Sequence, residues 1–115
     1  MGIENKMITI SQIQKVTDII VEEVRPEKVL LFGSYAFGVP DKHSDVDIIV
    51  IVREELEKKN RIDILTKLNL KTALPNLLFP KDFKMYSLNE YIELKENKYS
   101  FLYSALKNAK TLYER

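Results

Sequence analysis

Hydrophobic positions at the start of the chain recur with the period of a helix. Between residues 11 and 24, isoleucine and valine return every three or four positions, which is typical of one buried helix face. We expect Thr9 or Ser11 to cap this helix, because a side-chain oxygen there can accept a free first-turn N–H. Pro26 should end the helix and favour an extended backbone at Arg25.

Two apolar runs then predict neighbouring strands. Residues 28–32 form a short apolar run, and residues 46–53 are rich in β-branched side chains on both faces, as in a central strand. Between them we expect one or two helical turns over 34–38 and a loop over 39–44, which contains a proline. Sequential strands commonly pair, so the two runs should lie side by side.

The second half of the chain predicts two more strands among helices. A charged connection over 54–60 precedes leucines at helical spacing, and Pro75 should stop that helix. Polar and apolar residues alternate over 82–86, which indicates a strand, and Ser87 with Glu90 forms the pattern of a capping box. The capped helix should run to about residue 95, followed by a helix over 99–108 and a short edge strand at 111–113.

This order predicts a single domain over residues 1–115, of the α/β (α+β) class, with a small mixed β-sheet flanked by helices. The composition, 45% hydrophobic and 30% charged, is that of an ordinary globular domain. A net charge of +1 argues against a long nucleic-acid duplex as partner. The absence of cysteine excludes disulfides and thiolate metal sites. With neither a signal peptide nor an apolar membrane span, we expect a cytoplasmic protein.

Gly33 and Ser34 stand where the first expected strand ends and the expected short helix begins. Glycine lets the backbone approach a ligand closely, and free N–H groups at a helix start attract an anion such as phosphate. The Ser34 hydroxyl adds a donor. Because Gly-Ser pairs are also common turns, this feature alone is a weak sign of a phosphate site.

Asp45 and Asp47 flank Val46 at the start of the second expected strand, where residues two apart share a face. Two carboxylates this close disfavour joint ionisation, and a divalent metal that prefers oxygen ligands, such as Mg²⁺, resolves the conflict. The alternative is a polar strand entrance in which Asp45 caps the loop. If the strands are neighbours, these carboxylates lie beside Gly33, and the combined pattern is stronger than either part.

The spacing of Gly33-Ser34, ten residues and then Asp45-Val46-Asp47 resembles the hallmark of the DNA polymerase β-like nucleotidyltransferase superfamily. The chain length and residues 44–48 look like its minimal nucleotidyltransferase (MNT) group. The resemblance covers nearly the whole chain and implies the polymerase β-like nucleotidyltransferase fold.

The resemblance also implies a third carboxylate on a later strand. Asp82 matches it best, because it opens the alternating strand; Asp63 is the rival, but it lies inside a helical pattern. The plainer interpretation of Asp82 is a turn residue. By resemblance, Asp45, Asp47 and Asp82 would be the catalytic residues and the ligands of two Mg²⁺ ions, with Asp82 as candidate general base.

Phe37 departs from the family pattern. Many relatives have arginine or lysine three residues after the serine, where a cation would help to neutralise the triphosphate. Lys42 in the following loop is the candidate substitute, so we group it with Gly33 and Ser34 as expected ATP-binding residues.

The implied reaction is in-line transfer of AMP from ATP to a hydroxyl acceptor. Minimal members resemble antitoxins that neutralise HEPN-type ribonuclease toxins by adding AMP to a toxin tyrosine. We therefore expect an antitoxin of a toxin–antitoxin system, with ATP and a HEPN toxin as partners. We expect no membrane and no nucleic acid as direct substrate, and we leave homo-oligomerisation open.

Two other functions stay open. A non-catalytic module would bind the toxin and nucleotide and inhibit by occlusion, which Phe37 favours and the three acidic residues oppose. Transfer to a small hydroxylated molecule such as an aminoglycoside would need an acceptor pocket formed by dimerisation. The only histidine, His43, is expected to be a solvated loop residue.

Overall fold

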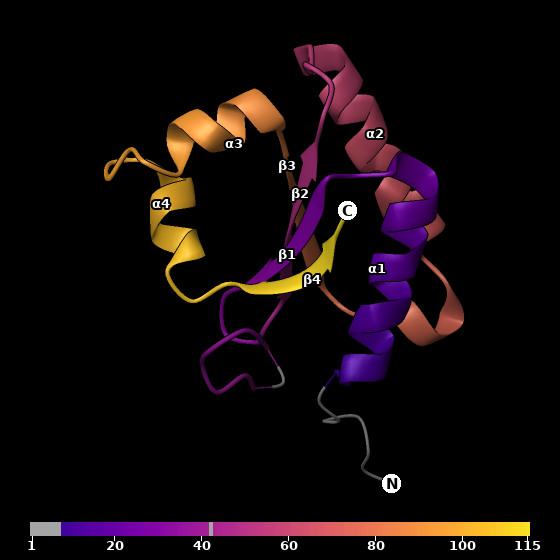
Figure 1. Ribbon diagram of the computed structural model, residues 1–115. Coiled ribbons are helices and arrows are strands. Elements are labelled where there is room, and N and C mark those ends of the chain that lie inside the picture. The colour runs from indigo at the N-terminus through magenta and orange to yellow at the C-terminus, as the bar shows by residue number, and fades with distance from the viewer. Residues whose placement is uncertain (1–7, 42) are drawn as a thin grey trace, which may run out of the picture.

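In the computed structural model, which describes residues 8–41 and 43–115, four strands form one mixed sheet in the order β3-β2-β1-β4 (Figure 1). β1 pairs antiparallel with both β2 and β4, whereas β2 pairs parallel with β3. The predictions of a small mixed sheet and of a C-terminal edge strand are both confirmed. The strands span Lys28–Phe32 (β1), Val46–Val52 (β2), Lys81–Ser87 (β3) and Lys110–Glu114 (β4).

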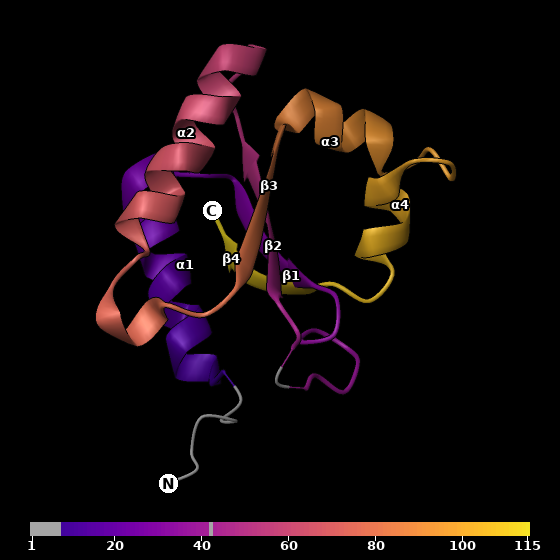
Figure 2. The same ribbon diagram turned by 180° about the vertical axis from the view of Figure 1, so that it is seen from behind.

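Helices cover both faces of this sheet. α1 (Ile10–Val24) and α2 (Lys58–Lys71) lie on one face, and α3 (Leu88–Leu94) and α4 (Phe101–Leu106) lie on the other (Figures 1 and 2). A short 3-10 turn, η1 (Pro75–Leu77), connects α2 to β3. Among the described residues, no helix has the length and apolar character needed to cross a membrane.

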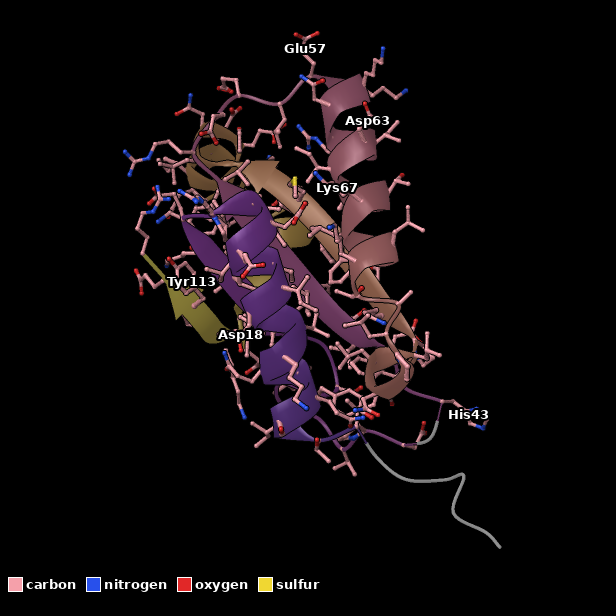
Figure 3. All side chains as sticks on the ribbon, turned by 90° about the vertical axis from the view of Figure 1, so that its right-hand side faces the viewer. Asp18, His43, Glu57, Asp63, Lys67 and Tyr113 are labelled. Carbon is pink, nitrogen blue, oxygen red and sulfur yellow. The ribbon has the colours of Figure 1, made fainter. Side chains whose placement is uncertain are left out.

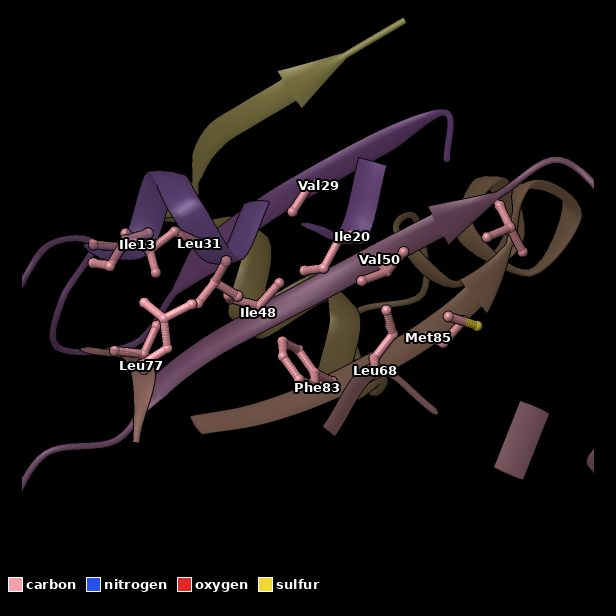
Figure 4. Packing of buried hydrophobic residues seen from close by; sticks show 14 residues of the cluster. Ile13, Ile20, Val29, Leu31, Ile48, Val50, Leu68, Leu77, Phe83 and Met85 are labelled. Carbon is pink, nitrogen blue, oxygen red and sulfur yellow. The ribbon is translucent and has the colours of Figure 1, made fainter. Parts of the chain in front are cut away.

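The alternation of β2 explains why its sequence is apolar on both faces. Ile48 and Val50 pack toward α1 and α2 in a cluster that includes Ile20 and Leu68 (Figure 4). Ile49, which lies between them, faces the opposite layer and packs in a second cluster under α3 and α4. A central strand covered on both sides needs such a pattern, because neither face meets water.

The ends of α1 show one confirmed expectation and one error. Thr9 is the N-cap: its Oγ1 accepts from the Gln12 N–H at 3.2 Å, while the Gln12 side chain accepts from the Thr9 N–H at 2.8 Å. The helix ends at Val24 as expected. The prediction of an extended Arg25 is wrong, because its φ of 52° and ψ of 60° are left-handed. This conformation lets the Arg25 N–H bond to the Val21 carbonyl at 2.9 Å and close the helix.

The expected helix over 34–38 is a hydrogen-bonded turn instead. The N–H groups of Ala36 and Phe37 both donate to the Gly33 carbonyl, at 2.9 and 3.3 Å, and the Gly38 N–H donates to the Ser34 carbonyl at 3.0 Å. The turn does not grow into a helix before Pro40, which lacks a backbone donor.

Two further boundaries differ from the sequence prediction. α2 ends at Lys71 rather than at Pro75, because the buried Thr72 hydroxyl donates to the Leu68 carbonyl at 2.8 Å and the Thr72 N–H bonds back into the helix. α4 is shorter than expected, since the Ser100 side chain caps it by accepting from the Tyr103 N–H at 3.0 Å. The predicted capping box of α3 is confirmed.

Candidate functional site

The sheet brings the predicted acidic residues to one edge. In register, Phe32 of β1 is opposite Asp47 of β2, and Asp47 is beside Asp82 of β3. The C-terminal end of β1 and the N-terminal ends of β2 and β3 therefore meet, and Gly33 and Asp45 lie directly next to these positions in the chain. The prediction that the glycine turn adjoins the first two carboxylates agrees with this arrangement.

Asp47 and Asp82 also share one face of the sheet. The residues that follow them, Ile48 and Phe83, belong to the core cluster under α1 and α2. Because side chains alternate along a strand, Asp47 and Asp82 point to the side of α3 and α4. Both carboxylates are partly buried, whereas Asp45, just before β2, is exposed.

Gly33 is fitted to Asp47 by two constraints. Its φ of +77° lies in the left-handed region, and an added Cβ would collide with Oδ2 of Asp47 and stand 3.3 Å from its Cγ. A side chain at this position would therefore displace the carboxylate as well as strain the backbone. Sequence reasoning expected Gly33 to admit a ligand; it missed that the backbone already touches an acidic residue.

Burial raises the pKa of the Asp47 carboxyl, and the neighbouring charges of Asp82 and Asp45 raise it further, while Lys84 acts in the opposite direction. The charges of two neighbouring carboxylates therefore act on Asp47 at this end of the sheet. Such a cluster is relieved by a proton or by a bound cation.

Lys84 and Phe101 are site residues that sequence reasoning did not single out. Lys84 Nζ lies 3.3 Å from Oδ2 of Asp82 and 5.3 Å from the centre of the Phe101 ring. The Phe101 ring meets Phe32 edge-on, with centroids 5.5 Å apart and planes at 78°. The alternation that located Asp82 was the available signal for Lys84, because residues two apart in a strand share a face. Nothing local in the sequence pointed to Phe101.

The donor set suits Mg²⁺ in kind, since carboxylate oxygens are its preferred protein ligands. In the arrangement present within residues 8–41 and 43–115, no three histidine, cysteine, aspartate or glutamate side chains converge on a point that could hold a metal ion. Asp82 is instead engaged by Lys84. A cation bound with Asp45 and Asp47 would therefore compete with Lys84 for the Asp82 carboxylate.

The loop between Gly33 and β2 is folded onto itself. The Asp41 N–H donates to Oγ of Ser44 at 2.9 Å, and the His43 N–H donates to Oδ1 of Asp41 at 2.8 Å. His43 is exposed and projects outward, as expected (Figure 3). Phe37 is 63% exposed. Lys42, the expected substitute cation, lies outside the described residues.

Asp63, the rival for the third carboxylate, lies elsewhere. It lines a cavity of about 510 Å³ with Glu54 and Glu55, which follow the C-terminal end of β2. Figure 3 shows Asp63 on α2 and His43 in the loop at opposite ends of the molecule. The geometry thus favours Asp82 over Asp63 as the partner of Asp47.

Comparisons with known proteins identify the family and the fold of the chain. A family model described as "Polymerase beta, Nucleotidyltransferase" matches residues 14–115. The protein named "Putative protein adenylyltransferase" from Methanocaldococcus jannaschii is 36% identical over 74 residues, which are 62% of this chain and 73% of that protein.

Two solved structures share the fold. One is a nucleotidyltransferase, so named as putative, from Sulfolobus solfataricus, with a TM-score of 0.58, 22% identity, and coverage of 91% of this chain and 85% of that one. The other is a tri-AMPylated Shewanella oneidensis HEPN toxin in complex with MNT antitoxin. It matches with a TM-score of 0.51, 18% identity, and coverage of 89% and 72%.

Proposed function

This chain belongs to the polymerase β nucleotidyltransferase family, and we propose that it transfers AMP from ATP to a tyrosine of a HEPN-type partner toxin. The observation that carries the proposal is the contact of Gly33 with Asp47, beside Asp82 in the next strand. The name of the M. jannaschii relative and the AMPylated toxin bound to an MNT antitoxin support a protein acceptor.

The residues divide the work of binding and transfer. The turn at Gly33 and Ser34 would orient the phosphates through backbone N–H groups and the serine hydroxyl. Asp45, Asp47 and Asp82 would hold Mg²⁺, which when bound neutralises charge on the triphosphate and lowers the pKa of the attacking hydroxyl. The donors suit that ion in kind, as described above.

The transfer step can be written with its proton balance. The acceptor oxygen forms a bond to the α-phosphorus of ATP, the bond from that phosphorus to the bridging oxygen breaks, and pyrophosphate leaves. The hydroxyl proton goes to Asp82. Asp82 lies on β3, the outermost strand of the sheet, so an acceptor can approach it from beside that strand.

Three apolar side chains on segments that adjoin the acidic residues in the fold are exposed to solvent. Phe37 is 63% exposed, Val39 is 94% exposed and Phe101 is 47% exposed. Apolar side chains beside an acidic edge suit a protein surface that covers them on binding. This supports a protein acceptor over a small polar molecule.

The test is label transfer. The protein is incubated with Mg²⁺, ATP labelled at the α-phosphate and the protein encoded by the neighbouring gene, tested as the candidate HEPN-type toxin. We expect label on a toxin tyrosine, lost in Asp47→Asn and retained in Asp63→Asn, which removes an acidic residue of the distant cavity. Undiminished transfer by an Asp45→Asn/Asp47→Asn double variant would contradict the assignment.

A second candidate function is inhibition by binding alone. The ion pair that engages Asp82 and the missing cation at Phe37 favour it. In that case the protein forms a tight complex with the toxin and suppresses its ribonuclease activity without labelling it. Suppression would then be equal for the natural protein and Asp47→Asn.

A further inference from the structure

Lys84 occupies a specific place above the acidic edge of the sheet. Its ammonium lies between the Asp82 carboxylate, at 3.3 Å, and the Phe101 ring, at 5.3 Å. Phe101 is itself fixed against Phe32, the register partner of Asp47. The three contacts place a cation directly at the proposed nucleotide site.

The placement follows from the local fold. β3 alternates, so Lys84 shares the face of Asp82 while Phe83 and Met85 enter the core. The aliphatic stem of a lysine can lie along an aromatic ring while its charge stays in water. The Lys84 side chain is 40% exposed and that of Asp82 is 47% exposed, so the pair can separate at low cost.

The turn over residues 33–41 contains no lysine or arginine, so phosphates bound there would need a cation from another segment. The lysine at the start of β3 is committed elsewhere: Lys81 Nζ donates to the carbonyls of Leu77 and Phe79, toward α2 and η1. Within the described residues, Lys84 is the cation whose charge acts on Asp47.

We propose that Lys84 is an exchangeable counter-ion: it pairs with Asp82 in the free protein and moves to the phosphates of the nucleotide when Asp82 binds a divalent cation. The inference rests on the proposed nucleotide and metal site, and it adds a residue that supplies a positive charge absent from residues 33–41. Lys84 thereby becomes a nucleotide-binding residue in the loaded state and a competitor of the metal in the free state.

The exchange predicts two effects of opposite sign. Removing the lysine charge frees Asp82 and lessens repulsion of the metal, so the metal alone should bind more tightly. The same change removes a charged contact to phosphate, so the nucleotide should bind more weakly. A residue that only supports the local structure would shift both affinities in the same direction or leave them unchanged.

The test measures binding and needs no turnover. Lys84→Met keeps the stem against Phe101 and removes the charge. Mn²⁺ alone is titrated by electron paramagnetic resonance, and an ATP analogue with a methylene bridge between the α- and β-phosphorus is titrated by calorimetry at saturating Mn²⁺. We expect the Mn²⁺ Kd to fall about threefold to tenfold, and the analogue Kd to rise about tenfold. Lys84→Arg should keep both close to the natural values because it retains the charge.

Lys28 offers a matched control. It also lies near a carboxylate and a ring, with Nζ 3.7 Å from Glu114 and 5.6 Å from the centre of Tyr91, but at the other end of β1. Lys28→Met should change neither Kd. Equal behaviour of Lys28→Met and Lys84→Met, or parallel shifts of the two Kd values in Lys84→Met, would overturn the exchange.

A variant of Asp47 separates this inference from the proposed function. If Asp47→Asn binds Mn²⁺ as tightly as the natural protein does, the proposed metal site is wrong and the proposed exchange is refuted with it. If Asp47→Asn abolishes Mn²⁺ binding while Lys84→Met alters neither affinity, the metal site stands and only the exchange is refuted.

Discussion

Asp47 and Asp82 are direct register partners across the parallel strands β2 and β3, although the whole of α2 separates them in the sequence. Their side chains share a face, and burial together with the charges of Asp82 and Asp45 raises the pKa of Asp47. In the free protein, ionisation of Asp47 is therefore unfavourable, and a bound proton or cation removes this penalty.

The first prediction concerns pH and stability in metal-free buffer. The pKa of Asp47 in the folded protein lies above its ordinary value of 3.8. The protonated Asp47 side chain therefore contributes its full stability below pH 3.8, and this contribution is lost as the pH rises through the folded pKa. Asp47→Asn should thus be more stable than the natural protein at pH 7, and the difference should shrink toward pH 3.8. Urea midpoints measured across this range check it.

The same variant should lose transfer by at least about a hundredfold, since a metal ligand supplies several kcal/mol of transition-state stabilisation. Mg²⁺ should raise the urea midpoint of the natural protein at pH 7 and not that of Asp47→Asn. An Asp47→Asn variant that is less stable than the natural protein at pH 7 would contradict the raised pKa.

The second prediction concerns Gly33. Gly33→Ala should lower the free energy of unfolding by about 1–2 kcal/mol, because the Cβ of alanine makes a left-handed φ sterically unfavourable. Its Cβ would also push against Asp47, so Mn²⁺ affinity and transfer should fall as well. Urea unfolding, Mn²⁺ titration and label transfer are the measurements.

Gly38→Ala is the matched comparison in the same turn. Its Cβ would stand 3.2 Å from Cα of Ser34, a tight contact that does not involve an acidic residue, and its φ is outside the left-handed range. We expect it to affect stability without the same loss of metal affinity. Equal metal affinity in Gly33→Ala and the natural protein would show that the contact with Asp47 is unimportant.

How far the sequence predicted this site depended on the range of the interactions. The period-two alternation of residues 82–86 located β3, and the Gly33-Ser34 and Asp45–Asp47 spacing identified the edge, because both patterns are local. The parallel pairing that sets Asp82 beside Asp47 is long-range, and resemblance rather than pattern identified that residue. The neighbourhood of Lys84 and Phe101 depends on how α4 packs over β1, which no local pattern encodes.

The errors in the fold have a similar origin. Arg25 was expected to be extended because it precedes proline, but closing α1 with a hydrogen bond to Val21 favours the left-handed conformation. The spacing of Leu74 predicts that α2 continues to Pro75, but Leu74 lies beyond the end of the helix and is 48% exposed. In both cases, hydrogen bonds at a helix end decided the outcome over the propensity of a single residue.

The third prediction concerns the junction of β3 and α3. Burial alone would raise the pKa of Glu90, but hydrogen bonds from Arg61 and Ser87 outweigh it and lower the pKa below 4.5. Glu90 accepts from Arg61 at 2.8 Å and from the Ser87 N–H at 2.8 Å. Glu90→Gln should therefore cost about 1 kcal/mol at pH 7. Because the folded pKa of Glu90 is lowered, its ionised carboxylate stabilises the protein above pH 4.5. The cost of Glu90→Gln should therefore vanish as the pH falls below 4.5 through the folded pKa.

Glu93→Gln on the same helix provides the control, since Glu93 is exposed and lies outside the capping box. Its urea midpoint should match that of the natural protein at both pH 7 and pH 4. A difference between Glu90→Gln and the natural protein that stays constant with pH would mean that the charge of Glu90 is not what stabilises the cap.

The fourth prediction restores the missing cation. Phe37 is 63% exposed in the turn after Ser34, so an arginine there reaches water and nucleotide without disturbing the core. Phe37→Arg should tighten binding of the methylene-bridged ATP analogue by about threefold to tenfold, because it adds a charged donor for phosphate. Calorimetry at saturating Mn²⁺ measures the change.

Val39→Arg is the control for a general effect of charge, since Val39 is 94% exposed two residues further on. Equal tightening by both variants would show that net charge, rather than the position after Ser34, sets affinity. The double variant with Lys84→Met is more informative still. If Lys84 supplies the cation that Phe37 does not, Phe37→Arg should gain more affinity in the Lys84→Met background than in the natural protein, and strictly additive effects would argue that the two positions act independently.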